Sequence, residues 1–373
     1  MSKSKAAVAA IPTVRVIDVG FGRVKLSRRA AGRAPGEVEF MHFPSMAIPS
    51  DPSAMRALGQ STRDTFDVPA AGAMYEVGMD IDLAQTGGDF GRDITDQFYL
   101  SPIYEALTKG ALRYMDEETI DLLVLGLPVN QYLNSDRRDY LEKTYQGEID
   151  IGGGKKVRIN EVLVRPQPLG GYVELGNHVD DLNKAIASTS GALEPLSRDE
   201  DLAALTTLVV DPGEHTTDWL LIRRGQINTK ASGAASDAGR HRVVRAVLEA
   251  LQAKVGRPLG PATMPLINDA LRLGKALKLS GTTYDLGEFE EVIKAAVDDP
   301  VSRLIEGVRG MHELIDIIVI VGGHPDRYRD ALAKRFPAIP VFVMADSMLA
   351  NARGFQIIGE AVMDAASEQP KAA

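Results

Sequence analysis

The feature that most constrains the fold is a unit of strand, aspartate, glycine turn and strand that occurs twice. The first copy lies in VRVIDVGFGRVKLSRR, residues 14–29, and the second in LTTLVVDPGEHTTDWLLIRRGQI, residues 205–227. In each copy an apolar run reaches an aspartate, passes a glycine and resumes as a second strand-like run. Either copy alone is most simply an ordinary β-hairpin. Two copies in matching strand contexts instead predict a chain with two similar halves.

The segments around these units alternate between helix and strand signals, which predicts an α/β chain. Residues 120–129 and 315–323 are continuous apolar runs typical of buried parallel strands. Residues 37–50 read as a third strand that leaves into a Pro/Ser loop, and residues 155–168 read as a pair of strands. Apolar spacing and caps predict helices over residues 101–115, 134–147, 178–191, 240–256 and 261–281.

Composition narrows the class of protein. A chain of 373 residues is longer than a single hydrophobic core usually organises, which predicts two domains. No apolar run reaches the roughly 18 residues of a membrane helix, so no membrane partner is expected. The absence of cysteine excludes disulfides, thiolate metal sites and cysteine nucleophiles, and it suits the cytoplasm. The net charge of -9 argues against direct nucleic acid binding.

Three glycine turns at strand ends carry the candidate chemistry. Glycines let backbone N–H groups approach phosphate oxygens, and consecutive N–H groups in a turn form an anion-binding concavity. Aspartates facing each other across a cleft can hold a hydrated Mg²⁺, which assigns Asp18 and Asp211 as metal-binding residues. The candidate binding residues are Asp18, Gly20, Phe21, Gly22 and Lys25 in the first turn, Asp211, Gly213, Glu214, His215, Thr216, Thr217 and Asp218 in the second, and Gly322, Gly323 and His324 in the third.

These turns resemble the phosphate loops of the actin, sugar kinase and heat-shock ATPase superfamily, and within it those of the bacterial and plasmid actin-like ATPases of the ParM/StbA type. The family's first loop, D-x-G-x-x-x-x-K, is matched from Asp18 to Lys25, and its second, D-x-G-x-x-T-x-D, from Asp211 to Asp218. GLPVNQY at 126–132 looks like the first connecting segment, and DSMLANARGF at 346–355 looks like the terminal helix. DPGEHTTDWLL is also similar to the second loop of the actin-like member of the PRTRC gene cluster.

The resemblance implies an α/β, actin-like ATPase fold: two similar domains around a nucleotide cleft, each with a mixed β-sheet flanked by helices and a smaller inserted subdomain. Domain I is then expected to comprise residues 1–175 and 346–373, with its insertion at about 33–100. Domain II is expected to comprise residues 176–345, with its insertion at about 226–310.

The resemblance also implies ATP or ADP and Mg²⁺ as cofactors, slow hydrolysis, and ATP-dependent assembly of the protein with itself into filaments. The implied role is cytoskeletal, in plasmid or other DNA segregation, with a DNA-binding adaptor protein between filament and plasmid. Two alternatives remain open. A small-molecule kinase of the same fold needs a catalytic aspartate and a large substrate pocket. A regulatory ATP-binding module would be similar to chaperones or to division-site membrane tethers, and a tether needs an amphipathic terminal helix.

Three residues depart from the family pattern or extend it. Gln167, in RPQP, stands where plasmid actins of this type often have a glutamate, and with Asp18 and Asp211 it forms the predicted catalytic set. Phosphoryl transfer to water needs positioning more than a strong base, so a glutamine suffices; a solvent-facing loop amide is the alternative. His324 follows the third turn, at a position where the family usually has a third glycine. The choice between ATP and GTP as the bound nucleotide therefore stays open. Lys275 is a candidate for the ribose side.

Overall fold

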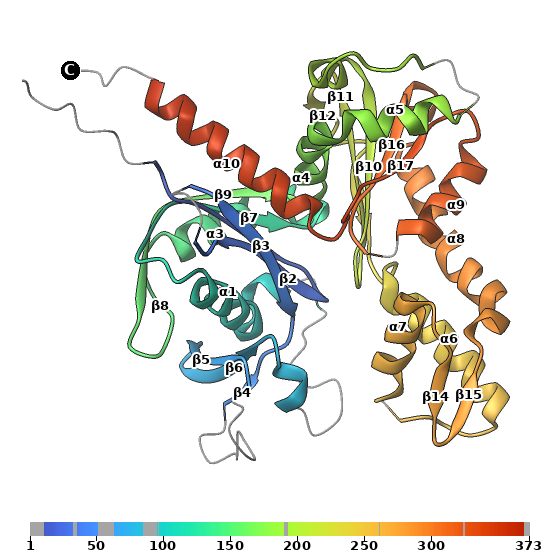
Figure 1. The fold of residues 1–373 in the computed structure, drawn as a ribbon, viewed down its shortest axis with the longest axis horizontal. Coiled ribbons are helices and arrows are strands. Elements are labelled where there is room, and N and C mark those ends of the chain that lie inside the picture. The colour runs from blue at the N-terminus through green and yellow to red at the C-terminus, as the bar shows by residue number, and fades with distance from the viewer. Residues whose placement is uncertain are drawn as a thin grey trace, which may run out of the picture.

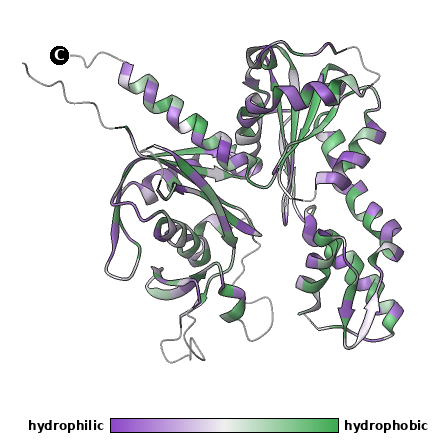
Figure 2. Ribbon diagram, in the orientation of Figure 1, coloured by the Kyte–Doolittle hydropathy of each residue, from purple (hydrophilic) through white to green (hydrophobic). Residues whose placement is uncertain are grey.

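The structure is a computed structural model that describes residues 11–32, 36–50, 63–84, 95, 97–189, 193–260, 262–323 and 325–368. Two main β-sheets lie side by side, each with its own helices (Figure 1). We call the first sheet with its helices domain I and the second sheet with its helices domain II. Apolar residues concentrate in the two sheets and on the helix faces that cover them (Figure 2). No helix in the described ranges is long and apolar enough to span a membrane.

The sheet of domain I has the strand order β3-β2-β1-β7-β9-β8. Its strands are β1 (Val14–Val19), β2 (Arg23–Arg29), β3 (Val38–Pro44), β7 (Thr119–Leu127), β8 (Gly147–Asp150) and β9 (Lys156–Pro166). Successive side chains of a strand point to opposite faces, and both faces here are buried. Leu123 and Leu125 of β7 belong to the core that includes helix α1 (Pro102–Met115), whereas Leu122 and Val124 pack with α10 (Ala350–Glu368).

The sheet of domain II has the order β12-β11-β10-β16-β17, with β13 paired to β11. Its strands are β10 (Thr206–Pro212), β11 (Thr217–Arg223), β12 (Gln226–Ile227), β13 (Gly233–Ala235), β16 (Ile317–Ile320) and β17 (Val341–Val343). Its helices are α5 (Val179–Ala187), α6 (Arg240–Val255), α8 (Glu290–Gly307) and α9 (Pro325–Arg335). In both domains the first strand of the antiparallel hairpin that carries the glycine turn also pairs with a parallel strand, β7 in domain I and β16 in domain II, so the predicted similarity of the two halves is confirmed.

Each domain also carries a smaller unit. In domain I it is the sheet β4 (Ile48–Pro49), β6 (Ala73–Gly78) and β5 (Thr65–Ala70). In domain II it comprises α7 (Thr263–Leu273) and the hairpin β14 (Leu277–Leu279) and β15 (Thr282–Tyr284) beside α6. The remaining helices are α2 (Val129–Tyr132), α3 (Ser135–Tyr145) and α4 (Gln167–Glu174), with 3₁₀ turns at Ile81–Ala84, Phe98–Leu100, Leu175–His178, Asp199–Ala204, Leu286–Phe289 and His312–Leu314.

The main sheets extend further into the predicted insertions than the sequence indicated. β3 pairs with β2 from Arg23 to Arg29, so the small sheet of domain I starts after Pro44 rather than near residue 33. Likewise β12 and β13 pair with β11 and belong to the main sheet of domain II, although the insertion was expected from about residue 226.

Two predicted elements were wrong in detail. Residues 155–168 do not form a strand pair but contribute one long strand, β9, whose hairpin partner is β8. The turn between them uses the glycines 152–154, all at positive φ, so β9 itself contains no turn. The helix predicted over 261–281 ends at Leu273, because Gly274 takes a left-handed conformation (φ 60°) and β14 follows.

The two domains are joined where α4 and α10 cross. α4 follows β9 of domain I and contacts β10 and β11 of domain II, while α10 follows β17 and lies across the first sheet (Figure 1). The backbones touch at glycines: a Cβ at Gly354 would overlap the carbonyl oxygen of Gly170, and one at Gly170 would overlap the carbonyl oxygen of Asn351. At this crossing the backbones of α4 and α10 are therefore in direct contact.

We expect Gly354→Ala to destabilise the protein, because the added methyl group meets backbone that has no rotamer to change. Overpacking of this kind costs roughly 1–3 kcal/mol. Urea unfolding measures the change. Gly260→Ala is the matched control, since a Cβ at Gly260 meets nothing within 4 Å. Equal stability of the two variants would contradict the close crossing.

Candidate functional site

The glycine turns of both domains open onto one cavity of about 680 Å³. Gly20, Phe21 and Gly22 of the first turn line it, as do Gly213, Glu214 and Thr216 of the second and Gly322 and Gly323 of the third. These segments lie at corresponding ends of parallel strands in two separate sheets. The turns predicted from the sequence to act together are therefore brought together by the fold.

Asp18 at the end of β1 organises the first turn. Its side chain is fully buried, and Lys25 Nζ donates a hydrogen bond to Oδ2 over 2.8 Å. Gln167 Nε2, at the start of α4, donates to Oδ1 over 2.6 Å. Lys25 and Gln167 line the cavity, whereas Asp18 lies behind them. Gly126 leaves room for this contact, since a Cβ there would lie 2.8 Å from Asp18 Oδ1.

Asp211 occupies the equivalent position at the end of β10 and lines the cavity. Asn351 Nδ2 of α10 donates to its Oδ2 over 2.6 Å, and the Asn351 Oδ1 accepts from Gly171 N of α4. A Cβ at Gly322, which has a φ of 78°, would overlap Asp211 Oδ1. The third turn thus needs glycine at this position for both conformation and space.

The charges of the first two turns act on one another. Burial opposes the charge on Lys25, but the carboxylates of Asp18 and Asp211 outweigh it and raise the pKa of Lys25. Burial raises the pKa of Asp211, Lys25 opposes that shift, and Asp18 adds to it. Lys25 is therefore attracted by both carboxylates, and a hydrated cation would stabilise the ionised form of Asp211.

Asp218 links the two domains. Thr216 Oγ1 donates to its Oδ2 over 2.6 Å, and the backbone N–H of Val129 in domain I donates to its Oδ1 over 2.6 Å. Burial is the main cause that raises the pKa of Asp218 from its ordinary value of 3.8 to about 7, and Asp211 adds to the shift. The side chain also lines the cavity.

The raised pKa of Asp218 predicts a pH-dependent stability. Between about pH 4 and 7 the unfolded chain ionises this carboxyl while the folded protein keeps it protonated, so the free energy of unfolding falls as the pH rises. The slope from one such group is at most about 1.4 kcal/mol per pH unit. In urea unfolding between pH 5 and 7.5, Asp218→Asn should reduce this fall. An unchanged slope in the variant would contradict the assignment.

The structure does not bring every predicted residue to the cavity. Thr217 Oγ1 donates to the Ala238 carbonyl and hydrogen-bonds Tyr328, so its hydroxyl points into domain II and away from the cavity. His215 packs edge-on against Phe21, with ring centroids 5.2 Å apart, and is not among the lining residues.

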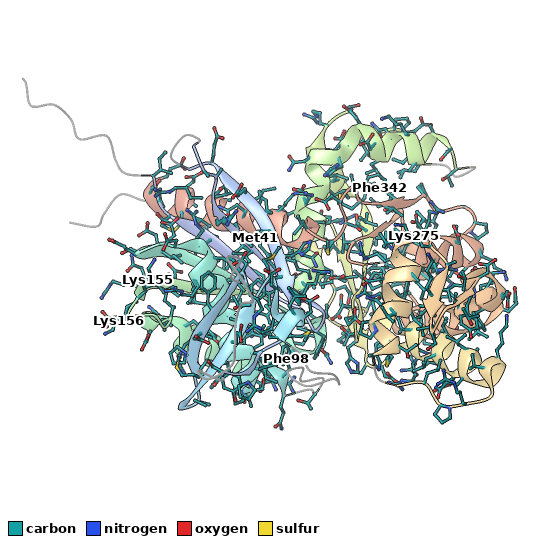
Figure 3. All side chains as sticks on the ribbon, turned by 60° about the horizontal axis from the view of Figure 1, so that its bottom comes forward. Met41, Phe98, Lys155, Lys156, Lys275 and Phe342 are labelled. Atoms are coloured by element: carbon teal, nitrogen blue, oxygen red, sulfur yellow. The ribbon has the colours of Figure 1, made fainter. Side chains whose placement is uncertain are left out.

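Of the two remaining candidates, one lies away from the cavity and the other is not among the described residues. Lys275 is exposed in the turn after α7 in domain II and does not line the cavity (Figure 3). His324 lies outside the described residues.

Several lining residues were missed by the sequence reasoning. Arg240 is the first residue of α6 and forms an ion pair with Glu214. Arg327 of α9 donates from Nη1 to both carboxylate oxygens of Glu290 over 2.7 and 2.8 Å. Asn351, which positions Asp211, lies in the quoted segment 346–355 without having been singled out. The arginine-rich start of α6 directly after a glycine was the available signal for Arg240.

The residues present fit a hydrated magnesium ion. In the described part of the chain no three His, Cys, Asp or Glu side chains are close enough to hold a bare metal ion. Mg²⁺ keeps several waters and takes few carboxylates, and Asp211 at the cavity matches that requirement. Asp18, predicted as a second metal-binding residue, does not, because Lys25 and Gln167 bind its two oxygens.

Comparison with known proteins identifies the fold. Residues 16–170 match the family model described as "Actin like proteins N terminal domain". No curated protein sequence matches the chain. Among solved structures, the archaeal actin homolog Ta0583 has a TM-score of 0.70 and 17% identity over 94% of this chain and 100% of that one. Its ADP complex has a TM-score of 0.66 and 15% identity, covering 96% and 100%.

A 15-stranded ParM filament from Clostridium botulinum has a TM-score of 0.65 and 14% identity, covering 94% of this chain and 99% of that one. The chain therefore has the actin-like α/β fold, with two mixed sheets flanked by helices, and this prediction is confirmed.

Proposed function

We infer that the chain is a Mg²⁺-dependent ATPase of the ParM/StbA type that assembles with itself into filaments when ATP is bound. The observation that carries this proposal is the meeting of two Asp-Gly turns from separate sheets at one cavity, with Lys25 bound to Asp18 and attracted by the carboxylate of Asp211. A metal-bound polyphosphate would bring positive charge to Asp211 and anion contacts to the turns.

Each group has a role in this proposal. The backbone N–H groups of the glycine turns and the Lys25 ammonium bind phosphate oxygens. Asp211 would hold a water of Mg²⁺, which supplies charge neutralisation at the phosphates, whereas Asp18 positions Lys25 and Gln167. Gln167 donates its amide N–H to Asp18, which leaves the amide oxygen to accept a hydrogen bond from the attacking water. Hydrolysis that relies on positioning alone is slow.

Filament assembly is supported by the comparison with ParM, whose 15-stranded filament has the same fold. The nucleotide would contact both domains, so its hydrolysis changes the contacts that hold them together, and subunits that meet head to tail without closure form open polymers. The proposed role is plasmid or other DNA segregation in the cytoplasm. The DPGEHTTDWLL turn supports the PRTRC-cluster member within this type, and the net charge of -9 suggests that an adaptor protein contacts the DNA.

Phosphate release tests the enzymatic part. The purified protein should release phosphate from ATP when Mg²⁺ is present, and this release should stop when the metal is chelated. Electron microscopy of the same sample should show filaments. Transfer of the phosphoryl group to an added small-molecule hydroxyl, without filaments, would indicate the kinase alternative. Binding without turnover or assembly would indicate the regulatory module.

A further inference from the structure

Arg240 is a cation at the cavity with unused donors. Its Nη2 lies 2.6 Å from Glu214 Oε2, and both side chains line the cavity. Its Nε is buried and has no hydrogen-bond partner within the described residues. A guanidinium carries five N–H donors in a fixed fork. The ion pair with Glu214 involves one nitrogen of this fork, and the side chain lines the cavity, so a ligand there can meet the guanidinium.

The ion pair lies where the first and second turns meet. A Cβ added at Gly22 would lie 3.0 Å from Glu214 Oε2, the same oxygen that pairs with Arg240. The start of α6 is fixed to the second turn, because the backbone N–H groups of Arg240 and His241 donate to the carbonyls of Gly213 and Glu214 over 2.9 and 2.8 Å. A group that enters between the turns must therefore contact this pair.

Other cations that line the cavity pair with carboxylates away from this junction, and among them Arg272 pairs with the exposed Asp269 on α7. Lys25 is bound by the fully buried Asp18, and Arg327 is bound by both oxygens of Glu290. Glu214 is half-buried and holds Arg240 through Oε2, an oxygen that faces the first turn. Arg240 is thus a cation at the junction of the first two turns whose carboxylate partner a phosphate can displace.

We propose that Arg240 detects the terminal phosphate of the bound nucleotide by exchanging the Glu214 carboxylate for phosphate oxygens; this rests on the proposed function. A phosphate repels the Glu214 carboxylate and matches the guanidinium fork with two parallel hydrogen bonds. A triphosphate carries one phosphoryl group more to the junction of the turns than a diphosphate does. When this phosphoryl group is lost, the Glu214 carboxylate pairs with Arg240 again. The partner of Arg240 therefore differs between the ATP-bound and the ADP-bound protein.

The test is the affinity of the full chain for a non-hydrolysable ATP analogue and for ADP, both with Mg²⁺, measured by calorimetry. Arg240→Ala should weaken analogue binding roughly 10- to 100-fold, as expected for lost charge-assisted hydrogen bonds, and change ADP binding by less than about threefold. Glu214→Gln removes the competing charge, so the ratio of analogue to ADP affinity should stay level or rise. Arg240→Lys keeps the charge without the fork and should be intermediate.

Arg245→Ala is the matched control, because Arg245 lies on the same helix in an exposed ion pair with Asp237 and does not line the cavity. If Arg240→Ala weakens the binding of the analogue and of ADP equally, Arg240 has only a structural role and the proposal is overturned. A lower ratio of analogue to ADP affinity in Glu214→Gln would overturn it as well. If the unmodified protein binds the analogue and ADP, and Arg240→Ala binds both with the same affinities, only the proposal about Arg240 is wrong. If the unmodified protein binds neither nucleotide, the proposed function is wrong too.

Discussion

Asp211→Asn should lose at least about 100-fold in phosphate release from Mg·ATP, a range typical of electrostatic groups in a preorganised site. The asparagine keeps the shape and can still accept from Asn351, but it removes the negative charge next to Lys25. Because burial raises the pKa of Asp211, the folded protein disfavours its ionised form. The variant should therefore be at least as stable as the unmodified protein at pH 8.

Phosphate release and urea unfolding, measured on the same preparation, separate the two effects. Asp269→Ala is a suitable control because Asp269 is an exposed carboxylate on α7 that does not line the cavity. If Asp211→Asn releases phosphate at the rate of the unmodified protein, Asp211 does not hold the metal. A loss of turnover together with a large loss of stability would instead give Asp211 a structural role.

Gln167→Ala should slow hydrolysis 10-fold or more while nucleotide affinity stays within about threefold, a range typical of groups that act in the transition state. The physical reason is its position: the amide is tied to Asp18 over 2.6 Å at the cavity wall, which fixes the orientation of its oxygen. Single-turnover phosphate release measures the chemical step, and calorimetry measures binding.

A large loss of affinity with an unchanged chemical step would place Gln167 at the nucleotide instead of at the water. Gln131→Ala provides a control, since Gln131 is also a buried glutamine but does not line the cavity. Equal slowing in both variants would point to a general effect of removing a buried amide from domain I.

The positions of Asp18 and Asp211 were predictable, because each ends a buried strand before a glycine turn and parallel strands end at one edge of a sheet. The assignment of the neighbouring threonines was not. Thr216 and Thr217 are adjacent, and near a strand adjacent side chains point to opposite faces. Only Thr216 reaches the cavity, whereas Thr217 binds Tyr328, which is 111 residues away in the sequence.

Contacts between distant segments account for most of what the sequence did not reveal. The hydrogen bond from Val129 to Asp218 spans 89 residues, and that from Asn351 to Asp211 spans 140. Neither has a local pattern. Lys275 was misplaced for a different reason: its helix was extended through Gly274, whose left-handed conformation ends the helix and leaves the lysine in an exposed turn.

The central claim is that the state of the nucleotide controls self-association, and sedimentation tests it most directly. At tens of micromolar protein with Mg²⁺, where weak protein interfaces become populated, the pelleted fraction should rise with ATP, persist longer with a non-hydrolysable analogue, and stay low with ADP. A protein that remains monomeric in analytical ultracentrifugation under all three conditions would contradict the account.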